Sequence, residues 1–147
     1  MNANKLLNGL LALVLMAGTV AGCGLLPGSQ AQPDGVYQDP EGTFSLPIPK
    51  DWQVEQEDGY ARVTSPEGGV TAYVLSLPET NPEAAISQAW GRIDPDFDLP
   101  VRSASERPAD EGMESAYGVD YETGDEDRYV LASTQLYQGR NYLFILD

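Results

Sequence analysis

The stretch that decides the fold is residues 70–93, VTAYVLSLPETNPEAAISQAWGRI. Residues 70–77 carry apolar side chains at both odd and even positions, which is typical of a strand inside a sheet. Asn81 favours the N-cap of a helix, and Pro82 suits the first helical position. An apolar stripe with helical spacing follows, made of Ile86, Ala89, Trp90 and Ile93. The stretch therefore predicts a central strand and a helix, 82–93, whose apolar stripe packs on the sheet.

Shorter strand signals lie on both sides of this stretch. On the N-terminal side they cover 36–37, 44–48, 52–57 and 60–65, and on the C-terminal side they cover 101–106, 113–122, 128–137 and 141–146. Asp58-Gly59 is a two-residue hairpin signal, so the three strands within 52–77 are expected to form a meander. The sequence therefore predicts an α+β fold: an antiparallel sheet of about seven strands with one helix packed on a face.

The strand predicted at 141–146 has apolar side chains on both faces. Its apolar side chains alternate between two faces, with Tyr142, Phe144 and Leu146 on one and Leu143 and Ile145 on the other. A strand of this kind needs burial on both faces, and one helix cannot shield both faces of seven strands. We therefore expect a further helix and strand beyond Asp147 to complete a sandwich. The chain would then be a fragment, or one domain of a longer protein.

The N-terminal residues have the features of a bacterial export signal. Lys5 supplies a positive charge, residues 6–20 are mostly apolar, and small residues precede the only cysteine, Cys23. The apolar run is shorter than the ~20 residues that a membrane-spanning helix needs. Val20-Ala21-Gly22-Cys23 resembles the lipobox of bacterial lipoproteins, which implies cleavage before Cys23 and acylation of that residue. The alternative is an ordinary secretory signal with an incidental cysteine.

These features predict three segments and a location. Residues 1–22 form a lipoprotein signal peptide, 23–35 a lipidated cysteine with a flexible tether, and 36–147 the folded domain. Glycine, proline and small polar residues dominate 24–35, and such a composition does not bury enough surface to fold. The protein is expected in the bacterial cell envelope, on the extracytoplasmic side, with the membrane as its partner through the lipid on Cys23.

Composition excludes several classes of function. The chain carries 23 acidic and 8 basic residues, a net charge of −15, and no histidine. A charge of this sign repels nucleic acid, so no nucleic-acid partner is expected. The lack of histidine removes the commonest general base and the commonest zinc ligand. No cofactor is predicted.

Two sets of residues resemble known families. Residues 39–52 have the pattern D-x-x-G-x-F-x-x-x-x-P-x-x-W, which looks like the opening of PsbP-like α/β sandwich domains. Residues 89–100 and 121–127 resemble the non-catalytic N-terminal domain of some bacterial β-lactamase-like serine hydrolases. The resemblance covers 36–147. It implies kinship to hydrolases whose catalytic domain, with its Ser-x-x-Lys motif, lies further along the chain.

No catalytic residue is carried over from this resemblance. Lys5 and Lys50 are the only lysines, and neither follows a serine by three residues. The predicted function is therefore a membrane-anchored, non-catalytic accessory or binding module. The alternative is the N-terminal part of a serine hydrolase whose catalytic domain lies beyond residue 147. A protein partner or that C-terminal hydrolase domain would then bind the module.

Two features are candidates for a ligand site. Asp94, Asp96 and Asp98 have the D-x-D-x-D spacing of a calcium loop. Leu99 and Ser105 stand where such a loop needs glycine and glutamate, so a solvated acidic connector is the favoured interpretation. Trp90 is a candidate for lining a ligand pocket, although packing in the core is favoured.

Overall fold

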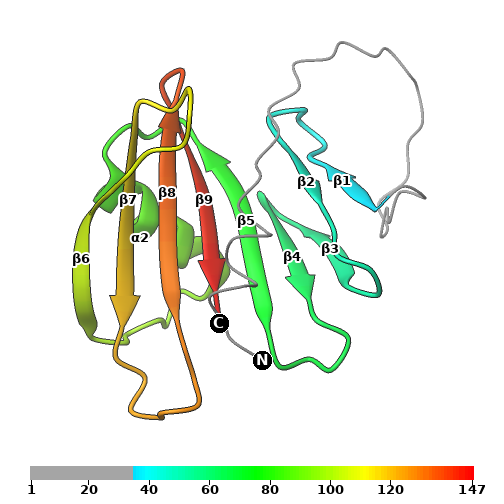
Figure 1. Cartoon of the computed structure of the whole chain (residues 1–147), viewed down its shortest axis with the longest axis vertical. Coiled ribbons are helices and arrows are strands. Elements are labelled where there is room, and N and C mark those ends of the chain that lie inside the picture. Colours follow the sequence, from blue (N-terminus) through cyan, green and yellow to red (C-terminus); the bar gives the residue numbers. More distant parts are fainter. Residues whose placement is uncertain (1–34) are drawn as a thin grey trace.

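The computed structural model describes residues 35–147 as nine strands and one helix (Figure 1). The strands before the helix are β1 (Val36–Gln38), β2 (Ser45–Pro47), β3 (Gln53–Glu57), β4 (Tyr60–Thr64) and β5 (Thr71–Leu77). Helix α2 spans Pro82–Ile93, and the strands after it are β6 (Val101–Arg107), β7 (Ser115–Tyr121), β8 (Leu131–Tyr137) and β9 (Arg140–Leu146). The predicted signal peptide, Cys23 and nearly all of the predicted tether lie outside the described residues.

Seven of the strands form one antiparallel sheet in the order β3-β4-β5-β9-β8-β7-β6. The meander predicted for β3, β4 and β5 is confirmed, and β9 lies at the middle of the sheet, next to β5. β1 and β2 form a separate two-stranded sheet. The α+β architecture and the seven-stranded antiparallel sheet that the sequence predicted are therefore both present.

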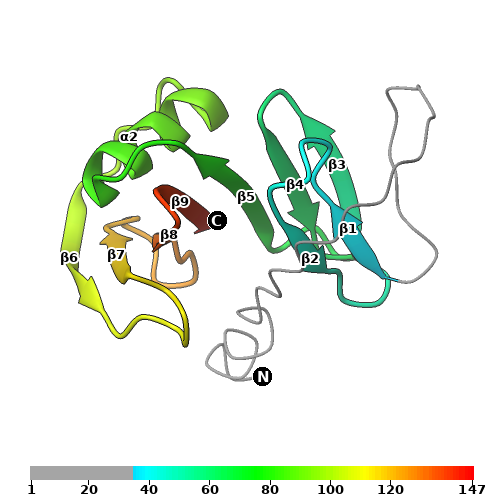
Figure 2. The same cartoon turned by 90° about the horizontal axis from the view of Figure 1, so that it is seen from above.

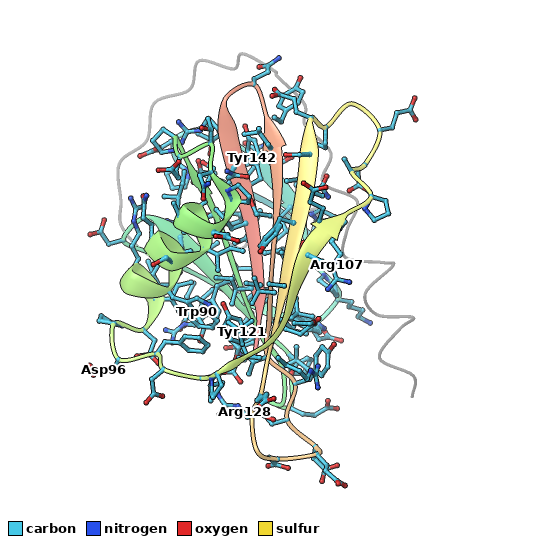
Figure 3. The ribbon with its side chains drawn as sticks, turned by 90° about the vertical axis from the view of Figure 1, so that its left-hand side faces the viewer. Trp90, Asp96, Arg107, Tyr121, Arg128 and Tyr142 are labelled. Atoms are coloured by element: carbon cyan, nitrogen blue, oxygen red, sulfur yellow. The ribbon has the colours of Figure 1, made fainter. Side chains whose placement is uncertain are left out.

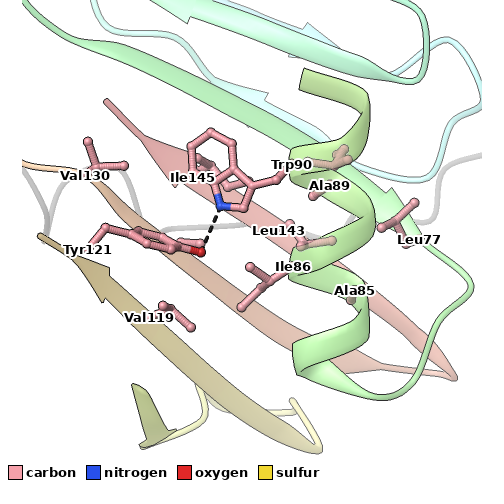
Figure 4. Close-up of a cluster of buried hydrophobic side chains, with 12 residues drawn as sticks. Leu77, Ala85, Ile86, Ala89, Trp90, Val119, Tyr121, Val130, Leu143 and Ile145 are labelled. Carbon is pink, nitrogen blue, oxygen red and sulfur yellow. Dashed lines mark hydrogen bonds between the residues drawn. The ribbon is translucent and has the colours of Figure 1, made fainter. Parts of the chain in front are cut away.

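Helix α2 begins and packs as its sequence predicts. The Asn81 side chain accepts a hydrogen bond from the backbone N–H of Ala84 at 2.9 Å, and Pro82 follows as the first helical residue. The helix buries Ala85, Ile86, Ala89 and Trp90. These side chains pack with residues of β5, β7, β8 and β9, among them Leu77, Val119, Leu143 and Ile145 (Figure 4). This is the first of two cores.

The second core lies on the opposite face of the sheet. It joins the two-stranded sheet to β3, β4 and β5 through Tyr37, Phe44, Leu46, Val54, Ala61, Val63, Ala72 and Val74. Ala72 and Val74 alternate along β5 with Leu75 and Leu77 of the first core, so the two cores occupy opposite faces. Seen from above, α2 lies over one half of the sheet and β1 and β2 lie beside the other half (Figure 2).

Two neighbouring rows of paired residues show how the apolar surface changes face along the sheet. The row that faces α2 runs from β6 to β4 through Ala104, Val119, Ala132, Ile145, Tyr73 and Arg62. The next row, which faces away, runs through Ser105, Gly118, Ser133, Phe144, Val74 and Ala61. The first row is apolar from β6 to β5, whereas the second is apolar only from β9 to β4.

The second core supplies cover for β9 that the sequence led us to expect from a further helix and strand. Leu143 and Ile145 of β9 are buried under α2, while Tyr142, Phe144 and Leu146 on its other face pack against the second core. The strands predicted at 36–37 and 44–48 form a small separate sheet, which lies over the face that the helix leaves open. Within residues 35–147, both faces of β9 therefore have apolar neighbours.

The cover supplied by β2 can be tested by removing one side chain. Leu46 is 1% exposed, so Leu46→Ala should lower the free energy of unfolding by about 2–5 kcal/mol through lost burial and a residual cavity. Val101, which is 57% exposed, provides the control, because Val101→Ala should change stability by no more than about 0.5 kcal/mol. Urea unfolding measures both. Equal stability of Leu46→Ala and wild type would show that β2 does not cover the sheet.

Candidate functional site

A groove lies between helix α2 and the edge strand β6. Its volume is about 560 Å³. The helix contributes Glu83, Ile86, Ser87 and Trp90, the connector after the helix contributes Asp94, Phe97 and Leu99, and strands β6 and β7 contribute Val101, Ala104, Tyr117, Val119 and Tyr121. The lining is mixed, with apolar side chains along the floor and carboxylates at the margin. This groove is the candidate site.

Three aromatic rings form one end of the groove. Trp90 and Phe97 stack with their ring centroids 3.6 Å apart and their planes 5° apart. Tyr121 meets both rings edge-on, at 5.8 Å from Trp90 and 4.9 Å from Phe97. The Trp90 indole N–H donates a hydrogen bond of 2.9 Å to the Tyr121 hydroxyl (Figure 4). Ring contacts of this kind add to burial, so the aromatic wall is fixed before any ligand arrives.

Burial raises the pKa of Tyr121. The hydrogen bond from Trp90 lowers this pKa, but its effect is smaller than that of burial. The phenol is therefore neutral at physiological pH and accepts from the indole without becoming ionised. A side-chain view from the edge of the sheet shows Trp90 and Tyr121 side by side between the helix and the strands (Figure 3). The hydrogen bond fixes the orientation of both rings at the groove wall.

The other end of the groove holds a carboxylate and a phenol. The Tyr117 hydroxyl donates a hydrogen bond of 2.9 Å to Glu83, in the first turn of α2. This hydrogen bond is the main cause of a raised pKa of Tyr117, so the phenol stays protonated. Glu83 is exposed and Tyr117 is half-buried at this end of the groove. A bound ligand would meet a carboxylate here and aromatic rings at the far end.

Strand β6 is the outer rim of the groove, and all seven of its residues are exposed. Among residues 35–147 it pairs with β7 alone, so its other edge carries no strand partner. The pairing register shifts between Val101 and Ser103, which marks a local irregularity at the start of the strand. Regular pairing from Ser103 to Arg107 leaves an uninterrupted edge of backbone beside the groove.

The three aspartates of the predicted calcium spacing lie on the connector between α2 and β6. Asp94 ends the helix and lines the groove, and its carboxylate accepts the backbone N–H of Asp96 at 3.2 Å. All three aspartates are exposed. In the described part of the chain no three acidic, histidine or cysteine side chains come together as a metal-holding group. The structure therefore does not bring Asp94, Asp96 and Asp98 together at one ion.

A polar cluster around Asp120 lies on the opposite face of β6 and β7. Asp120 accepts hydrogen bonds from Ser103 at 2.8 Å and from Tyr129 at 3.1 Å, and it pairs with Arg107 at 3.1 Å. Burial raises the pKa of Asp120, but these hydrogen bonds and the nearby arginines outweigh it and hold that pKa below the ordinary value. Arg102 lies over the Tyr129 ring, 5.4 Å from its centroid. Every member of the cluster has a partner within it, so we interpret the cluster as structural support for the edge strand.

Sequence reasoning identified part of the groove. Trp90 both packs in the core and lines the groove, so the two interpretations given to it describe the same side chain. Tyr117 and Tyr121 lie in the strand predicted at 113–122, and both line the groove. Phe97 and Glu83 were missed as groove residues, because no periodicity connects the residues of a helix to those of the loop that follows it.

Comparison with known proteins assigns no family to this chain. No family model matches it, and no curated protein is significantly similar in sequence. Across residues 35–147 no helix has the length and apolar character needed to pass through a bilayer.

The Asp120 cluster gives a pH-dependent prediction. A carboxylate whose folded pKa lies below its unfolded value stabilises the fold above the unfolded pKa, and this contribution is lost as pH falls through the folded pKa. Asp120→Asn should therefore lower the free energy of unfolding by about 1 kcal/mol at pH 7, and the difference from wild type should shrink as pH falls below about 4. Urea unfolding across this pH range measures it. The control Glu126→Gln, in an exposed turn, should differ little from wild type at any pH, and a constant Asp120→Asn difference would contradict the assignment.

Proposed function

We propose that this chain is a non-catalytic binding module, held at the extracytoplasmic face of a bacterial membrane by lipid on Cys23, and that the groove between α2 and β6 is its binding site. The observation that carries the proposal is the aromatic wall of Trp90, Phe97 and Tyr121 inside an open groove. The rings are fixed by packing and by the indole hydrogen bond, so the site is formed before binding.

The size and lining of the groove support this proposal. Binding sites in proteins usually have volumes of roughly 300–1,000 Å³, with aromatic and apolar walls and a few placed polar groups. The groove has about 560 Å³, with Glu83 and Asp94 at its margin. An apolar or aromatic group fits the wall, and a cationic group fits the margin. Non-covalent binding is thus the use that these side chains serve best.

A relation to PsbP-like domains and to the N-terminal domains of serine hydrolases belongs to the same proposal. Its support is the sequence patterns of 39–52, 89–100 and 121–127, together with a helix packed on an antiparallel sheet within residues 35–147. In such a relative the groove would serve recognition, and the chemistry would belong to a domain further along the chain. A Ser-x-x-Lys motif in the reading frame after residue 147 would support the hydrolase alternative.

Titration with indole, a small aromatic probe, tests the groove. The 147-residue chain can be made without lipid by cell-free synthesis and labelled with ¹⁵N. Indole should shift the side-chain N–H resonance of Trp90 saturably in the millimolar range, because it adds to the aromatic wall. Trp52, which packs against the other core, is an internal reference whose resonance should stay in place.

A matched pair of substitutions on β6 sharpens this test. Ala104→Trp fills the groove and should abolish the Trp90 shift. Ser105→Trp places the same side chain on the opposite face of the same strand and should leave the shift unchanged. Both positions are exposed, so neither change disturbs a core. Equal shifts of Trp52 and Trp90, or no effect of Ala104→Trp, would show that the groove is not a binding site.

The anchor is tested by Cys23→Ser expressed with the natural N-terminus in a bacterial host. Acyl chains contribute about 0.8 kcal/mol per buried methylene, so loss of two or three chains should move the protein from the membrane to the soluble fraction. Labelling by a fatty-acid probe should disappear at the same time. Retention of membrane association and label in Cys23→Ser would refute the anchor, and Ser29→Ala in the adjacent segment is the control.

A further inference from the structure

We propose that an extended segment of a basic polypeptide pairs with the free edge of β6 as an eighth strand of the sheet and directs alternate side chains toward the groove. This inference rests on the proposed function and names the class of its partner. Three independent observations carry it: the open edge of β6, the position of the groove beside that edge, and the signs of the charges around it.

The first observation is the open edge of β6. An edge strand presents a row of unpaired backbone N–H and C=O groups, and proteins usually cover or disrupt it. β6 has seven residues, all exposed, and its pairing with β7 is regular from Ser103 to Arg107. No other strand of residues 35–147 lies on its outer side. Backbone hydrogen bonds along this edge would therefore bind an extended segment without requiring a particular sequence.

The groove gives such a segment its side-chain contacts. Val101 and Ala104 of β6 line the groove opposite Ile86 and Trp90 of α2, so a strand added to the edge of β6 would lie alongside the groove, in the plane of the sheet. Side chains of a strand alternate between two faces, so every second residue of the segment would point to the same side as Ala104, toward the groove. Ala104 is small and leaves room beside that wall.

The charges around the groove indicate that the partner segment is positively charged. The carboxylates near it are Glu83 and Asp94 in its lining, Asp96 and Asp98 on the connector, and Glu106, which pairs opposite Tyr117 on the groove side of β6. The whole chain carries a net charge of −15. A segment rich in lysine or arginine would be attracted, and an acidic one repelled.

The nearby arginines do not neutralise these carboxylates, because each is held elsewhere. Arg102 lies over the Tyr129 ring, and Arg107 pairs with Asp120 on the far face of the sheet. Arg92, in the last turn of α2, lies against Gly59 in the hairpin between β3 and β4. The groove margin therefore keeps its negative sign, although three cationic side chains lie in the elements around it.

The same charge disfavours a second copy of this chain as the occupant. Two copies pairing edge to edge would bring together two strongly acidic surfaces, and like charges facing each other oppose association. A basic partner meets no such repulsion. Charge therefore favours a different polypeptide, with the opposite sign, over self-association.

A synthetic peptide, acetyl-Gly-Lys-Val-Lys-Phe-Lys-Val-Lys-Gly-amide, is the probe. On titration into the unlipidated 147-residue chain it should shift Trp90 and slow hydrogen exchange of backbone amides in β6. The same peptide with glutamate for each lysine should bind at least about tenfold more weakly. A version methylated at alternate backbone nitrogens keeps its charge but loses its hydrogen-bond donors, so it should also bind at least about tenfold more weakly. Equal binding of the methylated peptide would overturn pairing with the edge.

A charge-matched pair of variants separates the groove from general attraction to an acidic protein. Glu83→Gln with Asp94→Asn should weaken peptide binding by about tenfold. Glu67→Gln with Glu126→Gln removes two exposed charges elsewhere and should weaken it by less than about twofold. Equal weakening by both pairs would overturn the site. Sedimentation of the free chain as a dimer blocked by Ala104→Trp would also overturn the proposal, in favour of self-association.

The indole titration distinguishes the two levels of the argument. If indole shifts Trp90 but the basic peptide does not, the groove binds ligands and the peptide proposal is wrong. If neither shifts Trp90, the proposed function fails together with the inference that rests on it. If both do, and only the groove variants weaken the peptide, both proposals are supported.

Discussion

The pairing of β5 with β9 is the interaction on which the rest of the structure depends. These two strands adjoin each other at the middle of the sheet, and their side chains on one face contact α2 while those on the other face contact the second core. Each core alone is small for a chain of this size, so stability depends on strands that serve both. The sheet is accordingly apolar on one face in one half and on the opposite face in the other half.

Much of this fold could be predicted from the sequence, because the decisive signals are local. The cap at Asn81, the proline at the first helical position and the stripe ending at Ile93 define the helix within a few residues. The apolar character of residues 141–146 on both faces indicated a strand buried on both sides, and β9 lies at the middle of the sheet. Hairpin turns such as Asp58-Gly59 joined neighbouring strands correctly.

What could not be predicted depends on contacts between distant residues. Nothing in residues 36–48 says that they form a separate small sheet over β3 to β5 rather than an edge of the main one, because the register of a short strand is set by its partner. The groove could not be predicted from the sequence for the same reason. Phe97 stacks on Trp90 only because the connector turns back after Asp94, and that turn is visible in no pattern of spacing.

The central position of β9 also constrains the order in which this molecule can fold. Ala72 on β5 pairs with Leu146 on β9, although helix α2 and three strands separate these residues in the sequence. Forming a contact between residues so far apart in the sequence lowers the conformational entropy of the chain before the contact adds stability. Contacts of this kind slow the folding of antiparallel proteins. Until residues 140–146 are available, β5 and β8 have no strand between them and both cores lack one wall. A chain emerging from a ribosome or a membrane pore therefore cannot complete either core until residues 140–146 have emerged.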